Sequence, residues 1–375
     1  MTTHQQTMNT IPTDIVCVDD YLSYTNKILP LPTLEYINGG VADDITLNKN
    51  TSSFKRISIY NRVLSDFSHA QIRSNLFSGD KKQELSSPIL LAPVAHQSLV
   101  HDDGEMATAQ AAHALDMPMV VSTLASKKIE DIANHTDKKW FQLYWQPNKE
   151  ANLALIQRAI NSGYSAIVIT LDAGVNGLRN RAQRAGFTLP NNININLKNL
   201  PTSPAKPLNK GDSVILNGFM NDTPTLDDLK WLRQQTNLPL IAKGISHPDD
   251  AIAIKNIGFD GIIISNHGGR TLDTLPASID MLPAIRKAVG ADFTLLLDSG
   301  IRRGSDVFKA IALGANAVLV GRPQLWALAT AGALGVAHML KLLRDELEIT
   351  MALAGCPTIK DINQRSIFRN DESLG

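Results

Sequence analysis

The run Ser265-Asn266-His267-Gly268-Gly269-Arg270 combines three chemical capabilities. Its two glycines let the backbone approach a ligand closely. His267 can accept a proton near neutral pH, and Arg270 can bind a carboxylate through two N–H donors. Taken alone, the run also fits a turn capped by a histidine. The combination favours proton transfer on a substrate that carries a carboxylate.

Two later segments have the composition of a phosphate site. They are DSGIRRG at 298–304 and GRP at 321–323, and each precedes a segment with helical spacing. Glycine N–H groups, a helix N-terminus and arginine side chains together bind phosphate. Asp298 suits the hydroxyls of a sugar or ribityl chain. The sequence has no Walker motif, and no G-x-G-x-x-G follows a predicted strand, so a Rossmann site has no support.

Other polar residues follow one short apolar run after another. They are Ser122, Gln142, Tyr144, Thr170, Asp172, Arg179 and Lys243. Any one of them has an ordinary structural explanation, such as an ion pair for Lys243 or a cap for Thr170. Their recurrence at successive run ends predicts that they meet at one place.

The elements that would position these residues are eight apolar runs. We expect strands at 88–94, 118–123, 140–144, 166–172, 239–244, 261–265, 293–300 and 317–321. The runs are apolar throughout, which is typical of strands covered on both faces. Helical segments lie between them, with stop or cap signals at Gly163, Thr225, Gly258, Ser305 and Gly314. This alternation predicts an α/β fold, a (β/α)8 TIM barrel whose site lies at the C-terminal strand ends. The alternative is a doubly wound open sheet.

The length of 375 residues fits one barrel with additions. We expect a disordered tail at 1–12 and a single domain at 13–375. Within that domain we predict an N-terminal, mainly helical cap at 13–87, a barrel core at 88–322, and C-terminal helices with a tail at 323–375. Residues 185–224, rich in Asn, Pro and Gly, form a long loop after the fourth strand. Long loops at this position often act as lids, and a solvated loop is the alternative.

Composition excludes several protein classes. Lys plus Arg equals Asp plus Glu, at 36 each, which argues against a general nucleic-acid binder. Cys17 and Cys356 indicate neither a disulfide framework nor a zinc site, and we predict no metal site. The chain shows no signal peptide or membrane-spanning segment, so we expect a cytoplasmic protein without membrane insertion.

The motifs together resemble the FMN-dependent α-hydroxy acid oxidases and dehydrogenases, a family that includes glycolate oxidase, lactate oxidase and flavocytochrome b2. The resemblance rests on SNHGGR (265–270), LAPVA (91–95), WFQLY (140–144), AKG (242–244), DSGIRRG and GRP, and on Thr170, Asp172, Gly177 and Arg179. It extends from about Tyr21 to Ile362 and implies a (β/α)8 barrel that binds FMN.

The resemblance implies a role for each matching residue. His267 would be the catalytic base, Asp172 its carboxylate partner, and Lys243 and Tyr144 further catalytic residues. The substrate would be bound by Tyr36, Tyr144, Arg179, His267 and Arg270. FMN would be bound by Pro93, Val94, Ala95, Ser122, Gln142, Thr170, Lys243, Ser265, Asp298, Gly300, Arg302, Gly321 and Arg322.

The resemblance also implies the reaction. We expect oxidation of a small L-2-hydroxy acid, with L-lactate as the first candidate, to the 2-oxo acid. The electrons would pass to O2 or another acceptor, and the protein would be a homo-oligomer, a tetramer in this family. Leu124 stands where family members have Trp or Tyr, which leaves the substrate open. The alternatives are another FMN barrel, such as a type 2 isopentenyl diphosphate isomerase, and a non-catalytic flavin-binding barrel.

Overall fold

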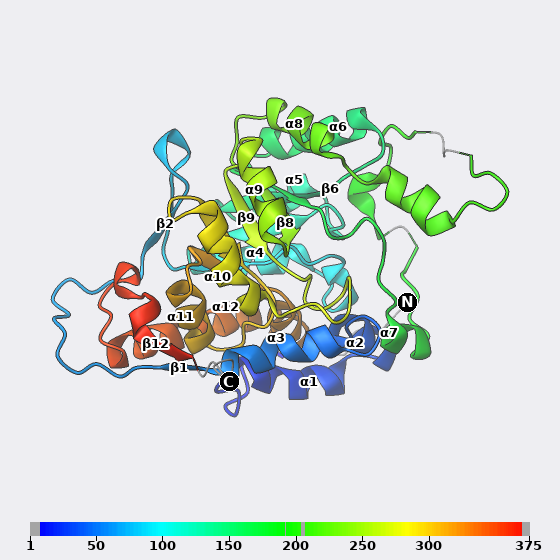
Figure 1. The fold of residues 1–375 in the computed structure, drawn as a ribbon. Coiled ribbons are helices and arrows are strands. Elements are labelled where there is room, and N and C mark those ends of the chain that lie inside the picture. Colours follow the sequence, from blue (N-terminus) through cyan, green and yellow to red (C-terminus); the bar gives the residue numbers. More distant parts are fainter. Residues whose placement is uncertain (1–7, 192, 204–206, 370–375) are drawn as a thin grey trace.

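The computed structural model describes residues 8–191, 193–203 and 207–369 (Figure 1). Most of the predicted N-terminal tail, residues 1–7, lies outside the described residues. From Met8 onward the backbone has tertiary contacts, beginning with a hydrogen bond from the Met8 amide to the Thr330 carbonyl at 3.0 Å.

Eight parallel strands form a closed barrel, which confirms the predicted fold. They are β4 (Ile89–Leu91), β5 (Met119–Ser122), β6 (Lys139–Tyr144), β7 (Ile167–Thr170), β8 (Leu240–Ile245), β9 (Gly261–Ile264), β10 (Thr294–Leu297) and β11 (Ala317–Val320). Neighbours in the chain are neighbours in the barrel, and β11 pairs with β4 to close it. The doubly wound open sheet is therefore wrong.

The strands are apolar throughout because both of their faces are buried. In β4, Ile89 and Leu91 belong to the core between strands and helices, whereas Leu90 belongs to a second cluster with Val120, Ile241 and other barrel residues. Successive side chains of a strand point to opposite faces, so one run supplies both cores.

Helices follow the strands around the barrel. They are α4 (Glu105–Ala114), α5 (Ile129–Ala133), α6 (Lys149–Asn161), α7 (Asn180–Arg184), α8 (Leu226–Gln234), α9 (Pro248–Asn256), α10 (Ser278–Val289), α11 (Gly304–Ala312) and α12 (Arg322–Leu353). Thr225 caps α8 as predicted, since its hydroxyl accepts from the Asp228 amide. Ser305 is not a cap: α11 begins at Gly304, with Arg303 at the capping position.

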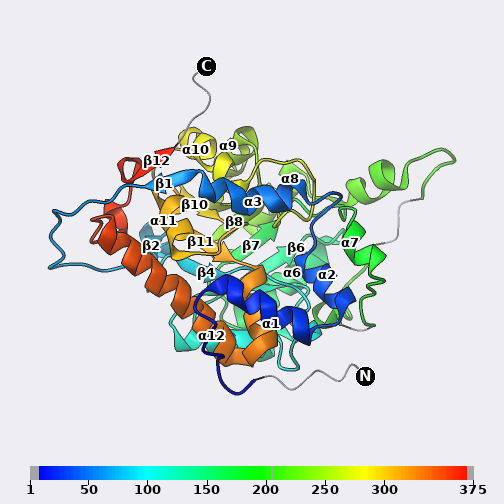
Figure 2. The same ribbon diagram turned by 90° about the horizontal axis from the view of Figure 1, so that it is seen from below.

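The N-terminal segment contains the expected helices and also short strands, which the sequence did not predict. The helices are α1 (Tyr21–Ile28), α2 (Leu31–Asn38) and α3 (Ile45–Lys55), which lie beneath the barrel in Figure 1 and are seen from below in Figure 2. The strands are β1 (Ile57–Ile59), which pairs with β12 (Ile367–Arg369), and the hairpin of β2 (Ser74–Leu76) and β3 (Gln83–Leu85). The hairpin packs Leu76 and Leu85 on the inner barrel cluster.

In the described part of the loop at 185–224, the regular structure is limited to short helical turns at Ile195–Leu197, Val214–Gly218 and Phe219–Asp222. Figure 1 shows part of it, in green, projecting from the barrel. Asn196 ties it to the barrel, because its buried side chain donates to the carbonyls of Ala125 (3.1 Å) and Lys127 (2.9 Å) and accepts from the Ile129 amide (3.1 Å). The loop is thus anchored near its start.

Helix α12 is long and apolar enough to meet the length and composition criteria for a membrane span, although the sequence suggested no such segment. Its most apolar 18-residue window has a mean hydropathy of 1.4, and 67% of that window is buried inside the protein. The helix is also kinked at Ala331 and Gly332. Its burial against α1, α4 and α11 is that of a core helix.

Candidate active site

A cavity of about 760 Å³ lies at the C-terminal ends of the barrel strands. Most of the predicted site residues line it: Tyr36, Pro93, Val94, Ala95, Tyr144, Thr170, Arg179, Lys243, His267, Arg270, Asp298, Gly300, Arg302, Gly321 and Arg322. The other four, Ser122, Gln142, Asp172 and Ser265, lie behind this wall and hydrogen-bond to residues that form it, Ser122 through the Leu124 amide. The closed barrel therefore brings the predicted set together.

His267 and Asp172 form a directed pair. The Nδ1 atom of His267 lies 3.0 Å from Asp172 Oδ1, so the N–H donates there and the lone pair is left on Nε2. Burial and the charge of Lys243 lower the pKa of His267, although Asp172 opposes them. Burial alone would raise the pKa of Asp172, but His267 and Lys243 hold it below its usual value. At neutral pH the pair is a neutral imidazole beside a carboxylate, which is the form of a general base.

Lys243 is the buried cation of the site. Its Nζ lies 3.2 Å from Asp298 Oδ2 and donates to Ser265 Oγ at 3.0 Å. Burial alone would lower the pKa of Lys243, but Asp298 and Asp172 outweigh that effect and raise it. The ammonium therefore stays charged, and it can stabilise negative charge that develops on a bound group.

A chain of hydrogen bonds joins the ends of β5, β6 and β7. Ser122 Oγ donates to Gln142 Oε1 at 3.0 Å, and Gln142 Nε2 donates to Thr170 Oγ1 at 2.9 Å. All three side chains are buried. This chain fixes the orientation of the Gln142 amide and of the Thr170 hydroxyl at the cavity wall, and such fixed polar groups suit recognition of a heterocycle.

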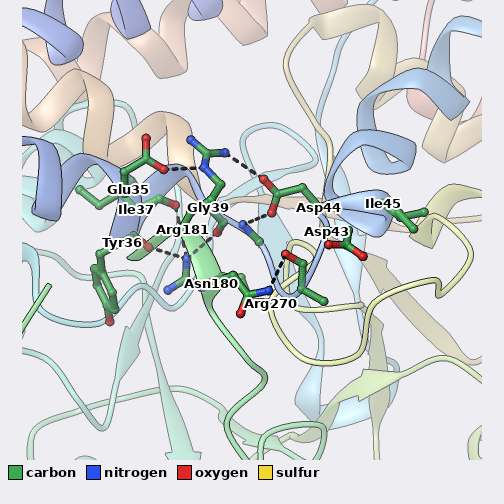
Figure 3. Close-up of polar contacts among 12 residues, drawn as sticks. Glu35, Tyr36, Ile37, Gly39, Asp43, Asp44, Ile45, Asn180, Arg181 and Arg270 are labelled. Atoms are coloured by element: carbon green, nitrogen blue, oxygen red, sulfur yellow. Dashed lines mark hydrogen bonds and ion pairs between the residues drawn. The ribbon is translucent and has the colours of Figure 1, made fainter. Parts of the chain in front are cut away.

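Two arginines flank Tyr36 at the cavity. The guanidinium carbons of Arg179 and Arg270 lie 5.6 Å and 5.1 Å from the centre of the Tyr36 ring. Arg270 Nη1 donates to the Tyr36 carbonyl at 2.7 Å, a contact that Figure 3 shows. Burial and the charge of Arg179 lower the pKa of Arg270 to about 10, so the Arg270 guanidinium is cationic at neutral pH. Two half-buried guanidinium groups beside one ring suit a carboxylate.

The sequence alone did not reveal which contacts hold α2 in the position that brings Tyr36 to the cavity. Arg181 of α7 forms ion pairs with Glu35 and with Asp44, and Figure 3 shows its guanidinium between them. Asp44 in turn accepts from the Gly40 amide at 2.7 Å. Tyr36 is therefore positioned by charges on its neighbours in the chain.

The predicted phosphate site holds two further arginines, Arg302 and Arg322, which are half-buried. Burial, together with the charges of Arg270 and Arg302, keeps the pKa of Arg322 well below its usual value. Burial also lowers the pKa of Arg302, whose guanidinium lies 4.8 Å from the Trp326 ring centre. These guanidinium groups repel one another, and an anion bound between them would relieve that repulsion. The residues therefore fit FMN, whose phosphate would be held by Gly300, Arg302, Gly321 and Arg322.

The backbone at 267–269 is left-handed at all three residues, with φ of 57°, 66° and 74°. Glycine is required at two of them: a Cβ on Gly268 would lie 2.6 Å from Arg322 Nη1, and one on Gly269 would lie 2.6 Å from the Leu47 amide. The peptide turn thus packs between the phosphate site and α3.

Sequence reasoning missed residues that support this turn. The amides of Asn50 and Asn266 form two reciprocal hydrogen bonds at 2.8 Å and 2.7 Å. Ser299 donates to Asp298 Oδ1 at 2.7 Å and accepts from the Gly268 amide at 2.9 Å. Asn50 lies in a polar helix, and no sequence pattern distinguishes it from its neighbours as a site residue. Ser299 lies inside the motif that the sequence analysis interprets as a phosphate-binding segment.

Comparisons with known proteins agree with this geometry. A family model described as FMN-dependent dehydrogenase matches residues 25–369. The chain belongs to this family. Its cofactor is therefore FMN, as predicted.

Several known proteins are similar to this chain over almost their whole length. An L-lactate oxidase of Alicycliphilus denitrificans is 46% identical over 360 residues, covering 95% of this chain and 97% of that protein. The human 2-hydroxyacid oxidase 1 is 36% identical, with coverages of 95% and 97%. A crystal structure of mandelate oxidase with (S)-2-phenylpropionate matches with a TM-score of 0.83 at 36% identity, covering 94% of this chain and 98% of that one.

Proposed function

We propose that this family member oxidises a small L-2-hydroxy acid, with L-lactate as the first candidate, to the corresponding 2-oxo acid. The observation that carries the proposal is the His267–Asp172 pair, 3.0 Å apart, with Arg179 and Arg270 lining the same cavity. A base next to two cations is the arrangement needed to deprotonate an alcohol whose neighbouring group is a carboxylate.

The protein's own residues have distinct tasks in this reaction. Arg179 and Arg270 bind the substrate carboxylate and fix the 2-hydroxyl near His267 Nε2, which accepts the hydroxyl proton. Asp172 stabilises the imidazolium that forms. Tyr144, whose hydroxyl lies 3.5 Å from His267 Nε2, stays protonated, because burial raises its pKa to about 12. When bound, FMN supplies the acceptor for the hydride equivalent from the α-carbon.

The identity of the relatives supports the substrate and the electron acceptor. Relatives named L-lactate oxidase reach 46% identity, and relatives named 2-hydroxyacid oxidase are also matched. We therefore favour O2 as the electron acceptor. An isomerase barrel or a non-catalytic flavin barrel has no need of the His267, Arg179 and Arg270 arrangement, so neither alternative is favoured.

An anaerobic titration tests the proposal. The yellow holoenzyme is mixed with L-lactate and other L-2-hydroxy acids without oxygen, and flavin absorbance is followed. We expect bleaching by L-lactate, and on readmission of air we expect the colour to return with formation of hydrogen peroxide. An FMN-loaded protein that no 2-hydroxy acid bleaches would contradict the proposal, and slow recolouring in air would indicate a dehydrogenase.

We further propose that the protein acts in the cytoplasm without membrane insertion. We also propose that it is a single-domain protein that forms a homo-oligomer, which the family resemblance suggests is a tetramer. Support comes from the balanced charge and from the burial of α12. Purification without detergent and mass measurement by light scattering test this. A need for detergent or a monomer of 40.8 kDa would contradict it.

A further inference from the structure

The segment at 60–67 crosses the surface outside every sheet, without a helix, turn or bend. Figures 1 and 2 both show it at the outer edge of the molecule, between β1 and β2. Its start is fixed, because the Tyr60 amide donates to the Ser366 carbonyl at 3.0 Å. Further along, the N–H groups of Val63 and Ser65 have no hydrogen-bond partner among the described residues. A straight segment with unpaired backbone groups is a template for another strand.

Large apolar side chains of this segment face solvent. Leu64 is 93% exposed and Val63 is 80% exposed. Leu353, at the end of α12, is also exposed, and its carbonyl accepts from the Asn61 side chain at 2.8 Å, so it lies beside the segment. Ile349, one helical turn earlier, is exposed as well. Neighbouring apolar side chains that are exposed together mark a contact surface.

The charges of the segment are symmetric about Leu64. Arg62 lies two residues before it and Asp66 two residues after it. Both side chains are exposed, and Arg62 forms no ion pair among the described residues. Asp66 is oriented by Ser68, whose amide and hydroxyl donate to the two carboxylate oxygens at 2.9 Å and 3.0 Å. If two identical segments ran antiparallel about Leu64, each arginine would face the aspartate of the other copy.

We propose that the segment at 60–67 pairs with the same segment of a second copy of this chain, antiparallel and centred on Leu64. The inference rests on the proposed homo-oligomer and specifies one of its contacts. The pairing provides partners for the N–H groups of Val63 and Ser65 and covers Leu64 with its counterpart. It also joins Arg62 of each copy to Asp66 of the other, as a twofold contact between identical surfaces requires.

The apolar residues beside the segment belong to the same contact. A stable interface buries about 800 Å² on each partner, so a strand pair needs further surface around it. Leu353 and Ile349 supply such surface next to the segment. A membrane surface is a poorer occupant, because it favours a basic patch, whereas the charges here are balanced. None of these residues lines the cavity, so the contact leaves the active site open to substrate.

Charge reversal tests the pairing. Arg62→Glu sets two carboxylates opposite each other at both ends of the pair, so the dissociation constant of the oligomer should rise by about tenfold or more. The double variant Arg62→Glu/Asp66→Arg restores opposite charges across a twofold pair and should reverse this loss. Light scattering of the FMN-loaded enzyme over a dilution series measures mass against the 40.8 kDa monomer. Lys341→Glu, which reverses an exposed charge on α12, is the control and should keep the wild-type mass.

A cysteine at the proposed axis gives an independent readout. Cys17 and Cys356 are buried, so a cysteine introduced on the surface supplies the accessible thiol. With oxidised glutathione, Leu64→Cys should form a disulfide-linked dimer, because residues directly opposite in an antiparallel pair have Cα atoms within disulfide range. Ala70→Cys is exposed on the same connection but away from the axis, and it should remain a single chain on a non-reducing denaturing gel.

The outcomes separate this contact from the proposals beneath it. An oligomer whose mass Arg62→Glu leaves unchanged would overturn the pairing, and so would a Leu64→Cys variant that cross-links no better than Ala70→Cys. A wild-type protein that is monomeric at every concentration would remove the proposed oligomer together with this contact. Flavin bleaching by L-lactate is measured on the same samples. Its absence in the wild type would remove the proposed reaction, while the mass and cross-linking results would still decide the contact.

Discussion

At the scale of single residues, the state of His267 depends on opposing neighbours. Burial and Lys243 favour the neutral ring, whereas Asp172 favours the charged one, and the balance lowers the pKa of His267. An imidazole that acts as a base must be neutral before it accepts the proton, and it is positively charged afterwards. Asp172 therefore contributes most once the proton has been transferred, because it then faces an imidazolium in a buried site.

Replacing the base tests its assignment. In His267→Gln, we expect flavin reduction by L-lactate to slow by about 10²–10⁴-fold, the usual contribution of a general base. FMN should stay bound, since Arg302 and Arg322 remain. Stopped-flow absorbance measures the rate and the flavin spectrum of the filtered protein measures retention. A near-normal rate with FMN bound would rule out His267 as the base.

The pH dependence follows from the sign of the same shift. Because the pKa of His267 lies below its ordinary 6.5, the rate of flavin reduction at limiting substrate should be constant from that pH up to the range near 10 where Arg270 loses its proton. It should fall as the pH drops through the lowered pKa, when the ring becomes protonated and cannot accept a proton. Anaerobic stopped-flow measurements at buffered pH values test this.

A matched variant sharpens that test. Asp172→Asn removes a charge that raises the pKa of His267, so the midpoint of the acid limb should move to still lower pH, and the plateau rate should drop. A midpoint that moves upward, or one unchanged in the variant, would contradict this account of the pair.

At the scale of elements, one asparagine anchors the long loop after β7. Asn196 is fully buried, and Arg158 adds hydrogen bonds to its carbonyl at 2.9 Å and to its Oδ1 at 3.1 Å. Residues on both sides of it line the cavity, including Phe187, which stacks on Tyr36 with ring centres 4.1 Å apart, and Phe219. The anchor therefore positions the loop segments that close the site.

Removing the anchor should loosen these segments. In Asn196→Leu, buried partners lose their hydrogen bonds, so we expect a loss of about 2–4 kcal/mol in the free energy of unfolding. We also expect a higher KM and faster proteolysis within 198–222. Thermal melts, steady-state kinetics and limited trypsin digestion measure these effects. Asn209 is exposed on the same loop, and Asn209→Leu is the control. Equal stability, KM and proteolysis rate in the two variants would show that Asn196 does not anchor the loop.

At the scale of the whole molecule, a formal net charge of zero conceals an uneven distribution. Lys243, Arg179, Arg270, Arg302 and Arg322 line one cavity, whose wall contains few acidic groups. Parallel strands concentrate their C-terminal ends at one mouth, so residues from distant segments add their charges there. The cavity suits two anions, a substrate carboxylate and a flavin phosphate.

The phosphate should therefore contribute to stability. We expect FMN at about 100 times its Kd to raise the unfolding free energy by about 2.7 kcal/mol, and riboflavin at the same concentration to raise it less, because it lacks the phosphate. Thermal melts of apoprotein measure the difference. Arg322→Met should reduce the extra stabilisation that FMN gives over riboflavin. Arg73, whose side chain is 70% exposed on the surface, is the control, and Arg73→Met should leave that difference unchanged. Equal stabilisation by both flavins would contradict the phosphate site.

Much of the fold and site was predictable from local sequence patterns. Strands buried on both faces must be apolar throughout, and polar residues that end such strands must meet if the strands are parallel. Those two constraints predicted the barrel and the grouping of Asp172, Lys243, His267 and Asp298 without knowledge of any contact. The family motifs then implied FMN, and the matching family model confirmed it.

Only the tertiary structure revealed the supporting contacts. Asn50 and Asn266 are 216 residues apart, and their pairing leaves no periodic signal in the chain. The neutral state of His96 follows from its burial near Arg179, and the role of Asn196 follows from carbonyls that belong to another loop. Residue type and spacing determine which elements form and where they end. A side chain's charge state and partners depend on what the closed barrel packs around it.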